Sequence, residues 1–487
     1  MPRIAIIGGG ISGLSAAFTL EEKRQSGAQP DTKIEYVLFE AAPRLGGVLV
    51  TDHVDGCLVE AGPDSFLTEK PWAADLCRKI GLGDQLIGSN DADRKTYIVV
   101  HKNGRDNLVV MPDGLMFMVP TKILPTVLSP LFSLRTKMRM ATEWFHPPRD
   151  HSQNQAAEDE TVAQMVERHY GAEMVDLLAD PLLSGVYGGE ATQLSVRAVL
   201  PRFVDMESKH GSLGRAMLRS RKEARKKMAA APKTPPRPLF TSLKNGMQQM
   251  VDALVERLDS DALKTSTPVQ SVIRQDDGWT LSAGYQSDHF DALIVATPAH
   301  AAASVLEFAD ANLARELNGI QYSSSVTVTL GYDDKVRRSL PPGFGFLVPR
   351  SAGRRMLAAT FVHDKFPHRA PENRAIVRCF LGGARDEQIL QLSEKEILAI
   401  VRAELRQIVA LDAEPLFARV YKWKSAMAQY SVGHLERLQR IESLRQQLPG
   451  LALAGNGYNG IGVPDCVRSG AEAASKILAE LGMWSSA

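Results

Sequence analysis

The chain opens on a short apolar run that leads directly into glycines. Residues 4–7 (IAII) are followed by the pattern G-x-G-x-x-G and then by a helix-forming segment. This order predicts a β-strand, a tight turn and an α-helix in direct succession. A second apolar strand is expected over residues 34–39, ending at Glu40. Near the other end, the apolar residues 451–454 predict a strand before a second glycine-rich turn, and a helix is expected from about residue 466 to 481.

Two internal segments depart from these patterns. Residues 111–144 are rich in Leu, Met and Phe, are broken by prolines and are followed by basic residues. This composition suits a segment in the headgroup layer of a membrane, and it equally suits buried helices that roof a substrate tunnel. Residues 219–237 are basic and then proline-rich. We expect a helix end and a solvated linker there, with attraction to anionic lipid as the alternative.

Composition narrows the class of protein. A chain of 487 residues with 44% hydrophobic content predicts about two or three domains. The net charge of +1 gives no global field that would recruit nucleic acid. The four cysteines include no C-x-x-C pair, so neither a zinc ribbon, another metal site nor a disulfide framework is expected. Without a secretion signal or a stretch that reaches the roughly 20 apolar residues of a membrane span, we expect a cytoplasmic protein.

Each glycine of the first motif has a distinct role in a dinucleotide-binding fold. Gly8 permits the tight turn, Gly10 lets backbone amides approach a pyrophosphate, and Gly13 lets the helix pack closely on the strand. The helix N-terminus then presents its partial positive charge to the phosphates. Glu40, at the tip of the second strand, is placed to accept hydrogen bonds from both ribose hydroxyls.

The residues after Glu40 favour FAD over NAD. Arg44-Leu-Gly46-Gly47 resembles the R-x-G-G segment of amine-oxidase-like flavoproteins. In that fold class, the C-terminal strand and glycine turn, here residues 451–464, reach the flavin ring and the ribityl chain. The resemblance therefore implies that the two ends of the chain build one cofactor site.

Longer matches resemble one family within that class, the porphyrinogen oxidases of late haem synthesis. The segment 59–68 (VEAGPDSFLT) is similar to the flavin-adjacent segment of these enzymes, and further matches extend over nearly the whole chain. They include residues 183–190, 242–248, 343–349, 430–434 and 457–466. The resemblance implies a non-covalently bound FAD, because Cys466 carries no specific mark of covalent attachment. The FAD contacts it implies are Gly8, Gly9, Gly10, Ile11, Ser12, Gly13, Glu40, Arg44, Gly46, Gly47, Val48, Gly62, Pro63, Asp64, Ser65, Val269, Gly455, Asn456, Ile461, Gly462 and Val463.

The same resemblance implies where a substrate binds. The family holds a flat macrocycle between apolar side chains, and the matching positions are Leu347, Thr360 and Phe380. Thr360 departs from the larger apolar residue of some members, which implies a looser or more polar wall. Lys95 is a candidate partner for a propionate, although a solvated surface lysine is an equally good interpretation. No catalytic residue is identified, and His434 and Asp64 suit structural roles better than that of a base.

The implied reaction removes six electrons from a porphyrinogen in three two-electron steps. No second strand–glycine–helix unit is visible that could seat a nicotinamide nucleotide, so molecular oxygen is the expected acceptor and hydrogen peroxide the by-product. Coproporphyrinogen III and protoporphyrinogen IX both stay open, with a preference for the former. The alternatives are a flavin amine oxidase, a carotenoid-type desaturase, or a non-catalytic relative similar to the escort proteins of prenylated GTPases.

The resemblance also implies the domain organisation and the partners. The expected fold is α/β (α+β), with a Rossmann-like FAD-binding domain, a mixed-sheet substrate domain and a helical subdomain that contacts the membrane in one interpretation. The expected partners are a porphyrinogen, oxygen, a peripheral membrane surface and other haem-pathway enzymes, with no nucleic acid, for a monomer or a homodimer. The FAD-binding domain is expected over 1–88, 240–300 and 450–487, the helical subdomain over 89–200, a basic, proline-rich linker region over 201–239 and the substrate domain over 301–449.

Overall fold

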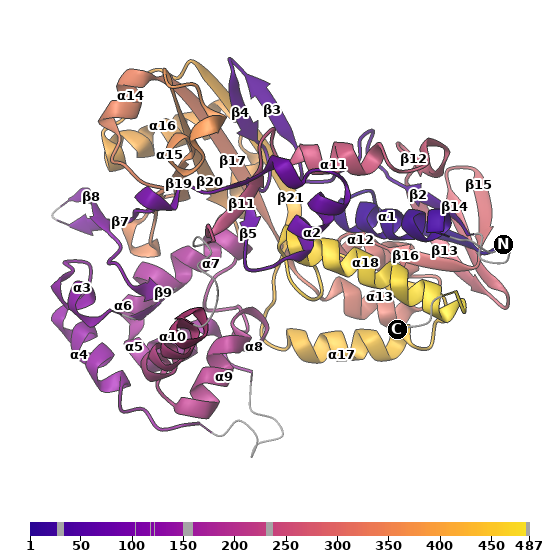
Figure 1. Cartoon of the computed structure of the whole chain (residues 1–487), viewed down its shortest axis with the longest axis horizontal. Coiled ribbons are helices and arrows are strands. Elements are labelled where there is room, and N and C mark those ends of the chain that lie inside the picture. Colours follow the sequence, from indigo (N-terminus) through magenta and orange to yellow (C-terminus); the bar gives the residue numbers. More distant parts are fainter. Residues whose placement is uncertain are drawn as a thin grey trace. The chain divides into compact units, whose positions relative to one another are not determined.

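The structure is a computed structural model that describes residues 1–26, 34–102, 104–116, 118–120, 122–149, 159–229 and 237–483. The chain divides into two compact units, which are coloured by sequence in Figure 1. The first unit contains residues 1–89, 238–321 and 436–487, and the second contains residues 90–237 and 322–435. From the sequence, we expected the chain to leave or enter the FAD-binding domain after residues 88, 239, 300 and 449. In the structure, the chain passes from one unit to the other after residues 89, 237, 321 and 435.

A five-stranded parallel sheet forms the centre of the first unit, in the order β12-β2-β1-β16-β22. The apolar runs predicted at both ends of the chain supply β1 and β22, and both lie against β16 from the middle of the sequence. The strands are β1 Arg3–Ile7, β2 Glu35–Phe39, β12 Leu263–Lys264, β16 Ala292–Val295 and β22 Leu451–Leu453. Parallel strands that are buried on both faces consist of continuous apolar runs, as β1 and β22 do. Because both strands pair with β16, the motifs near the two ends of the chain lie on one sheet.

Helices α1 (Ile11–Ser26) and α18 (Val463–Glu480) pack directly against each other (Figure 1). A Cβ on Gly470 of α18 would lie 2.0 Å from the carbonyl oxygen of Ser12, so only glycine permits this approach. Helix α18 is the helix predicted over residues 466–481, and it begins three residues earlier than predicted, at Val463.

Smaller elements complete the first unit. Three of its sheets are short: β3–β4, β5-β11-β6 and the antiparallel β13-β14-β15. Their strands are β3 Thr51–Val54, β4 Cys57–Glu60, β5 Phe66–Leu67, β6 Leu86–Gly88, β11 Phe240–Leu243, β13 Val269–Gln275, β14 Gly278–Ala283 and β15 Gln286–Phe290. The helices are α2 Trp72–Lys79, α11 Gln248–Val255, α12 Ala299–Leu306, α13 Ala311–Asn318 and α17 His434–Arg445, with 3₁₀ turns at Gly83–Gln85 and Ser260–Ala262.

The second unit is built on a seven-stranded mixed sheet, in the order β21-β17-β20-β19-β18-β7-β8. Only the β18–β7 pair is parallel among these neighbours. One face packs against α16 through Val328, Cys379, Ile397 and Val401. The strands are β7 Thr96–Lys102, β8 Arg105–Val110, β17 Tyr322–Asp333, β18 Gly345–Leu347, β19 Met356–Phe361, β20 Arg374–Gly382 and β21 Phe417–Ala428; the helices are α14 Asp334–Ser339, α15 Val362–Lys365 and α16 Glu394–Val409, with 3₁₀ turns at Asp91–Asp93, Arg350–Ala352, Pro367–Arg369 and Glu387–Gln391.

A helical part of the second unit has its own apolar core. Where a linker region was expected over residues 201–239, the structure has two helices up to residue 229, because Phe203, Met206, Leu213 and Met217 are spaced to bury one face. The proline-rich residues 230–236 lie outside the described residues. The elements are α3 Ile123–Leu128, α4 Leu134–Glu143, α5 Val162–Tyr170, α6 Ala172–Met174, a π-helical turn Val175–Ala179, α7 Asp180–Tyr187, α8 Val196–Val199, α9 Pro201–His210 and α10 Leu213–Ala229, with β9 Leu115–Met116 and β10 Val119–Pro120.

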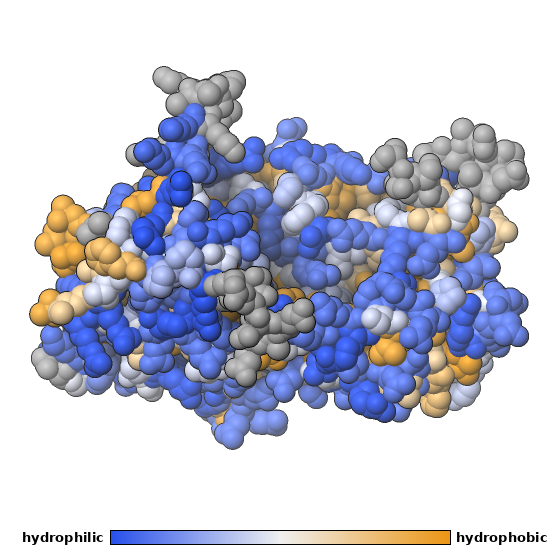
Figure 2. Space-filling view, turned by 90° about the horizontal axis from the view of Figure 1, so that it is seen from below, coloured by the Kyte–Doolittle hydropathy of each residue, from blue (hydrophilic) through white to orange (hydrophobic). Residues whose placement is uncertain are grey.

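The apolar segment 111–144 forms β9, β10, α3 and α4, and part of it lies at the surface. Figure 2 shows hydrophobic side chains gathered on the surface where α3 and α4 lie. Leu124, Leu128, Leu134 and Met138 are each more than 60% exposed. Within the described ranges, no helix is long and apolar enough to cross a bilayer.

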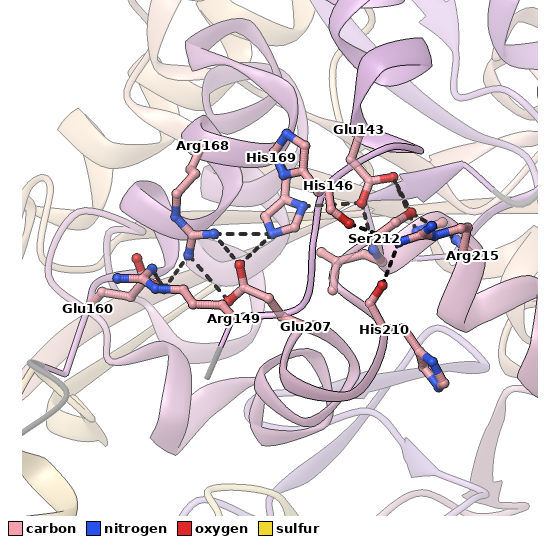
Figure 3. A network of polar contacts seen from close by, with 12 residues as sticks. Glu143, His146, Arg149, Glu160, Arg168, His169, Glu207, His210, Ser212 and Arg215 are labelled. Atoms are coloured by element: carbon pink, nitrogen blue, oxygen red, sulfur yellow. Dashed lines mark hydrogen bonds and ion pairs between the residues drawn. The ribbon is translucent and has the colours of Figure 1, made fainter. Parts of the chain in front are cut away.

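A buried polar network holds the helical part together (Figure 3). The His169 ring on α5 contacts Glu143 of α4 through Nδ1 at 3.2 Å and Glu207 of α9 through Nε2 at 3.0 Å. Arg168 also donates to Glu207, and it donates to Glu160 at 2.5 Å. Both ring nitrogens face carboxylates, so the doubly protonated imidazolium satisfies the network best.

The pKa values agree with this charge state. Burial lowers the pKa of the His169 imidazole, but the hydrogen bonds and charges of Glu143 and Glu207 outweigh it and raise the pKa above 6.5. Burial likewise raises the pKa of the Glu207 carboxyl, but the bonds from His169 and Arg168 lower it to about 2. The stabilisation by His169 is therefore complete below pH 6.5 and is lost as the pH rises through its raised folded-state pKa.

We predict that His169→Gln destabilises the protein most at low pH. Removing one partner of a buried ion pair costs about 3 kcal/mol of unfolding free energy, and this cost should shrink as the pH rises, because wild-type His169 then loses its charge as well. Thermal unfolding of both proteins from pH 6 to pH 10 measures the difference. His53→Gln is the control, because His53 is the exposed residue of strand β3. A His169→Gln difference that stays constant or grows with pH would contradict the charged assignment.

Candidate functional site

The first glycine turn is closed by backbone contacts that exclude side chains. Gly8 has a φ of +107° and donates its N–H to the carbonyl of Phe39 at 2.8 Å. A Cβ on Gly13 would lie 1.9 Å from the carbonyl oxygen of Gly8. These two glycines are required by the fold of the turn itself.

Gly10 differs from its neighbours because it faces open space. A Cβ built on Gly10 meets no heavy atom within 4 Å, whereas one on Gly9 would lie 2.4 Å from the Leu45 side chain. Ile11 and Ser12 follow as the first residues of α1. A space bounded by glycine at the start of a 16-residue helix is the arrangement that admits a pyrophosphate.

Glu40 lies at the end of β2, beside this turn. Its Oε2 accepts a hydrogen bond from the N–H of Gly9 at 2.6 Å, and its Oε1 accepts one from Ala42 at 2.7 Å. A carboxylate has about four lone-pair sites, so each oxygen can still accept a ribose hydroxyl. Glu40 therefore fixes the glycine turn, a role that the sequence pattern did not indicate.

The segment Arg44–Val48 is tied to the glycine turn. Gly46 donates its N–H to the carbonyl of Gly9 at 2.8 Å. The Arg44 guanidinium donates to the carbonyls of Leu45 and Gly47, and burial lowers the pKa of Arg44. Arg44 thus closes its own loop, while the Cβ position of Gly47 lies 3.3 Å from Gly10.

The Gly62–Ser65 segment reaches the same place from another direction. A Cβ on Gly62 would lie 2.0 Å from the carbonyl oxygen of Val48, so the two loops are in direct backbone contact. Asp64 follows Pro63; its carboxylate accepts from the Ser65 hydroxyl at 2.7 Å, and its carbonyl accepts from Ser242 at the same distance. Asp64 is buried within this loop, which suits a structural role.

The C-terminal glycine turn is anchored on α18. Gly455 donates its N–H to the Ser469 hydroxyl at 3.1 Å, and Gly462 donates to the Asp465 carboxylate at 3.3 Å. Asp465 also accepts from Lys70 at 2.6 Å, although it is only 4% exposed. Asn456 and Ile461 lie in this turn, and Val463 is the first residue of α18.

Three residues that the sequence did not single out take part in this arrangement. Lys70 and Asp465 form the ion pair at the start of α18, and no local pattern marks residues so far apart in the chain. Thr297 lies between the turns: a Cβ on Gly8 would lie 3.0 Å from its Cγ2, and one on Gly455 3.5 Å from its carbonyl oxygen. The buried Thr297 Oγ1 has no hydrogen-bond partner among the described residues, so it can bind a polar ligand there.

Val269 is also brought to this region. The preceding Thr267 donates its N–H to the carbonyl of Glu40 at 2.8 Å, and Ser266 donates to that of Ala42 at 2.9 Å. Val269 begins β13 two residues later and is half-buried. All the residues expected at FAD thus belong to the first unit.

The expected substrate residues lie in the second unit, on one face of its sheet. Leu347 on β18 pairs with Ala358 on β19, and Ala358 pairs with Phe380 on β20. Thr360 is two residues beyond Ala358, and alternate residues of a strand share a face. Leu347, Thr360 and Phe380 are each half-buried, whereas the opposite face is closed by α16.

Two cationic side chains differ in their relation to this face. Arg378 pairs with Thr360, is buried, and places its guanidinium carbon 4.9 Å from the centre of the Phe380 ring. Lys95 is exposed just before β7. Since Ile98 pairs with Leu347, the two-residue repeat of the strand directs Lys95 toward the other face. The structure therefore points to Arg378, which the sequence had not marked, as the nearer cation.

The surroundings of two other candidate residues, His434 and Cys466, indicate structural roles. The His434 ring stacks on Tyr430 with centres 4.1 Å apart and is buried. Burial raises the pKa of the Cys466 thiol to about 12, which makes it a poor nucleophile. Within the described residues, no group of three or more His, Cys, Asp or Glu could hold a metal ion.

The first unit fits FAD on its own geometry. The open space at Gly10, the orphaned hydroxyl of Thr297 and the carboxylate of Glu40 converge on the carboxyl edge of the parallel sheet, where this fold class binds nucleotides. Gly8–Gly13 would hold the pyrophosphate and Glu40 the ribose. The turn at 455–463 is anchored on α18, and the resemblance of the sequence implies that it would face the flavin.

Comparison with known proteins agrees with this geometry. A family model described as "Flavin containing amine oxidoreductase" matches residues 11–478. The coproporphyrinogen III oxidase of Bacillus subtilis (strain 168) is 33% identical, with 98% of each chain covered, and that of Staphylococcus aureus is 28% identical, with 98% of this chain and 99% of the relative covered. A solved structure from Exiguobacterium sp. 255-15 has a TM-score of 0.83 at 29% identity and 99% coverage of each chain.

We predict that Gly10→Val folds but does not retain FAD. The side chain enters space that is open in the protein, so thermal stability without cofactor should be unchanged, while affinity for FAD should fall at least about tenfold because the pyrophosphate is displaced. Flavin absorbance after purification and titration of FAD into the apoprotein measure this. Gly13→Val is the contrasting variant, since its Cβ collides with Gly8 and should destabilise the fold; full flavin occupancy in Gly10→Val would contradict the site.

Proposed function

The chain belongs to the flavin-containing amine oxidoreductase family, and on that premise we propose that it is a FAD-dependent, oxygen-dependent porphyrinogen oxidase of haem synthesis. The observation that carries the proposal is the end-to-end match to relatives named coproporphyrinogen III oxidase, at 33% identity for the Bacillus subtilis protein. A match over 98% of both chains includes the second unit, with its half-buried sheet face, as well as the FAD site.

Coproporphyrinogen III is the substrate we favour. Relatives from three bacteria carry that name, at up to 33% identity. Plant relatives at 27–29% identity are named protoporphyrinogen oxidase, and so is the bacterial solved structure from Exiguobacterium at 29%. Coproporphyrinogen bears more propionates than protoporphyrinogen, so it needs more cationic or hydrogen-bonding partners. Arg378, beside Phe380 on the half-buried face, suits one propionate.

The chain's own residues bind and orient the substrate. Leu347 and Phe380 offer apolar surface to a flat ring, and Thr360 leaves a smaller and more polar position between the strands that carry them. When bound, FAD supplies the two-electron acceptor for each oxidation. Three such oxidations convert the porphyrinogen to the porphyrin, and three oxygen molecules are reduced to three of hydrogen peroxide.

We predict that the FAD-loaded protein consumes about three oxygen molecules per porphyrin formed, as three two-electron steps require. An oxygen electrode and porphyrin fluorescence measure the two quantities in one reaction, and added catalase should lower the apparent ratio by half. Coproporphyrinogen III should react faster than protoporphyrinogen IX under air. If amines bleach the flavin anaerobically while porphyrinogens do not, the protein is an amine oxidase instead.

We further propose that the protein is cytoplasmic and touches a membrane surface with α3 and α4, as a monomer or homodimer among other haem-pathway enzymes. The exposed side chains of Leu124, Leu128, Leu134 and Met138 form an apolar surface over two consecutive helices. Arg135 and Arg139 are exposed on α4, so the surface combines apolar residues with charges that suit lipid headgroups. This composition supports a helix that lies in the interface plane.

We predict that the double variant Leu128→Ser, Met138→Ser weakens binding to vesicles of phosphatidylcholine by about tenfold, because both side chains leave water only at the membrane. Cosedimentation measures the bound fraction. Phe308→Ser, which replaces an exposed apolar residue of the first unit, is the control and should bind as the wild type does. Equal binding of the double variant and the wild type would contradict the membrane contact.

A further inference from the structure

A hollow lined mostly by cations lies where α9 meets α10 in the second unit. Its volume is about 340 Å³. Lys209 lies in the last turn of α9, while Arg215 and Arg219 are one turn apart on α10 and so share a helix face. The lining residues are Pro148, Lys209, His210, Arg215 and Arg219.

Arg215 is held in place by the backbone. Its Nη2 donates to the carbonyl of His146 at 2.8 Å and to that of His210 at 2.7 Å (Figure 3). Its own N–H donates to the Ser212 hydroxyl at 3.0 Å. The Nε and Nη1 donors have no partner among the described residues, so Arg215 presents a fixed guanidinium with donors to spare.

The wall of the hollow is rigid because the buried network lies directly behind it. The Glu143 carboxylate accepts from the Leu213 N–H at 2.6 Å and from the Ser212 hydroxyl at 2.9 Å, and thereby caps the start of α10. A Cβ on Gly211 would lie 2.3 Å from the carbonyl oxygen of His146, so the turn between the helices packs tightly. With the helix start capped, the positive charge of the hollow comes from its side chains.

The cations of the hollow are not neutralised by the surrounding described residues. No carboxylate in the described ranges forms an ion pair with Lys209, Arg215 or Arg219. The nearby Glu207 is committed to His169 and Arg168. Like charges gathered around one space repel each other, and an anion placed among them removes that cost.

We propose that this hollow binds a phosphate-bearing anion, either the headgroup of a phospholipid or a soluble phosphate ester. Three permanent cations exceed what one carboxylate neutralises, whereas a phosphate monoester carries about −1.5 to −2 charges and accepts several charge-assisted hydrogen bonds. The hollow belongs to the helical part of the second unit, whereas the residues of the FAD site belong to the first unit. It is therefore a second site, independent of porphyrinogen oxidation.

Calorimetric titration of the FAD-loaded protein tests the proposal, since bound FAD fills the other phosphate-binding site. Pyrophosphate and glycerol 3-phosphate probe the soluble source, and vesicles of phosphatidylcholine with or without phosphatidylglycerol probe the lipid source. Binding of the soluble phosphates identifies a soluble ligand, and vesicle binding that tightens when phosphatidylglycerol is added to the phosphatidylcholine identifies a headgroup. Lys209→Gln and Arg219→Gln should each weaken that binding about tenfold.

Lys222→Gln is the matched control, because Lys222 is an exposed cation of α10 that does not line the hollow. It should change the affinity less than twofold. Equal losses in Lys222→Gln and Arg219→Gln would show general surface attraction and overturn the site. So would binding by none of these phosphates. Porphyrinogen turnover by the Lys209→Gln variant should equal that of the wild type, so a failed pocket leaves the oxidase proposal intact.

Discussion

Close backbone contact at glycine is the constraint on which the first unit depends. A Cβ at Gly13, Gly62 or Gly470 would lie about 2 Å from the carbonyl oxygen of another residue, namely Gly8, Val48 or Ser12. Each contact joins elements that carry part of the same site: the first turn to its helix, the loop after β4 to the loop after β2, and α18 to α1. A side chain at any of the three would push these elements apart. The parallel sheet brings the segments to one edge, and the glycines let them meet there.

Within this edge, one residue serves both the fold and the ligand. Glu40 holds the N–H groups of Gly9 and Ala42 and so fixes the loops on either side of the open space at Gly10. A nucleotide that binds the remaining lone pairs would meet a carboxylate already oriented by the backbone, which lowers the entropy lost on binding. The same principle applies at the other end of the chain, where Lys70 compensates Asp465 at the first turn of α18.

The apolar runs and glycine motifs were sufficient to predict the strands and the helix next to them. The run before Gly8 predicted β1, and the run before Gly455 predicted β22 and α18, whose start was missed by three residues. Contacts between distant segments carried no such signal: Lys70 and Asp465 are 395 positions apart, and either residue alone resembles an ordinary surface charge. Helix α9 and the first part of α10 were missed for another reason. Frequent charges suggested a linker, while the apolar residues that bury one helix face are fewer and only their spacing reveals them.

The net charge of the chain is close to zero, but positive and negative side chains are separated locally. In the helical part, Glu143 and Glu207 are drawn into the interior, where His169 and Arg168 neutralise them. The carboxylates nearest to the turn between α9 and α10 are therefore not available to the cations at its surface. Because Glu143 both accepts from the start of α10 and contacts His169, the network that compensates the buried charge also fixes the wall that carries Arg215. Rigidity on the inside and uncompensated positive charge on the outside thus have one structural cause.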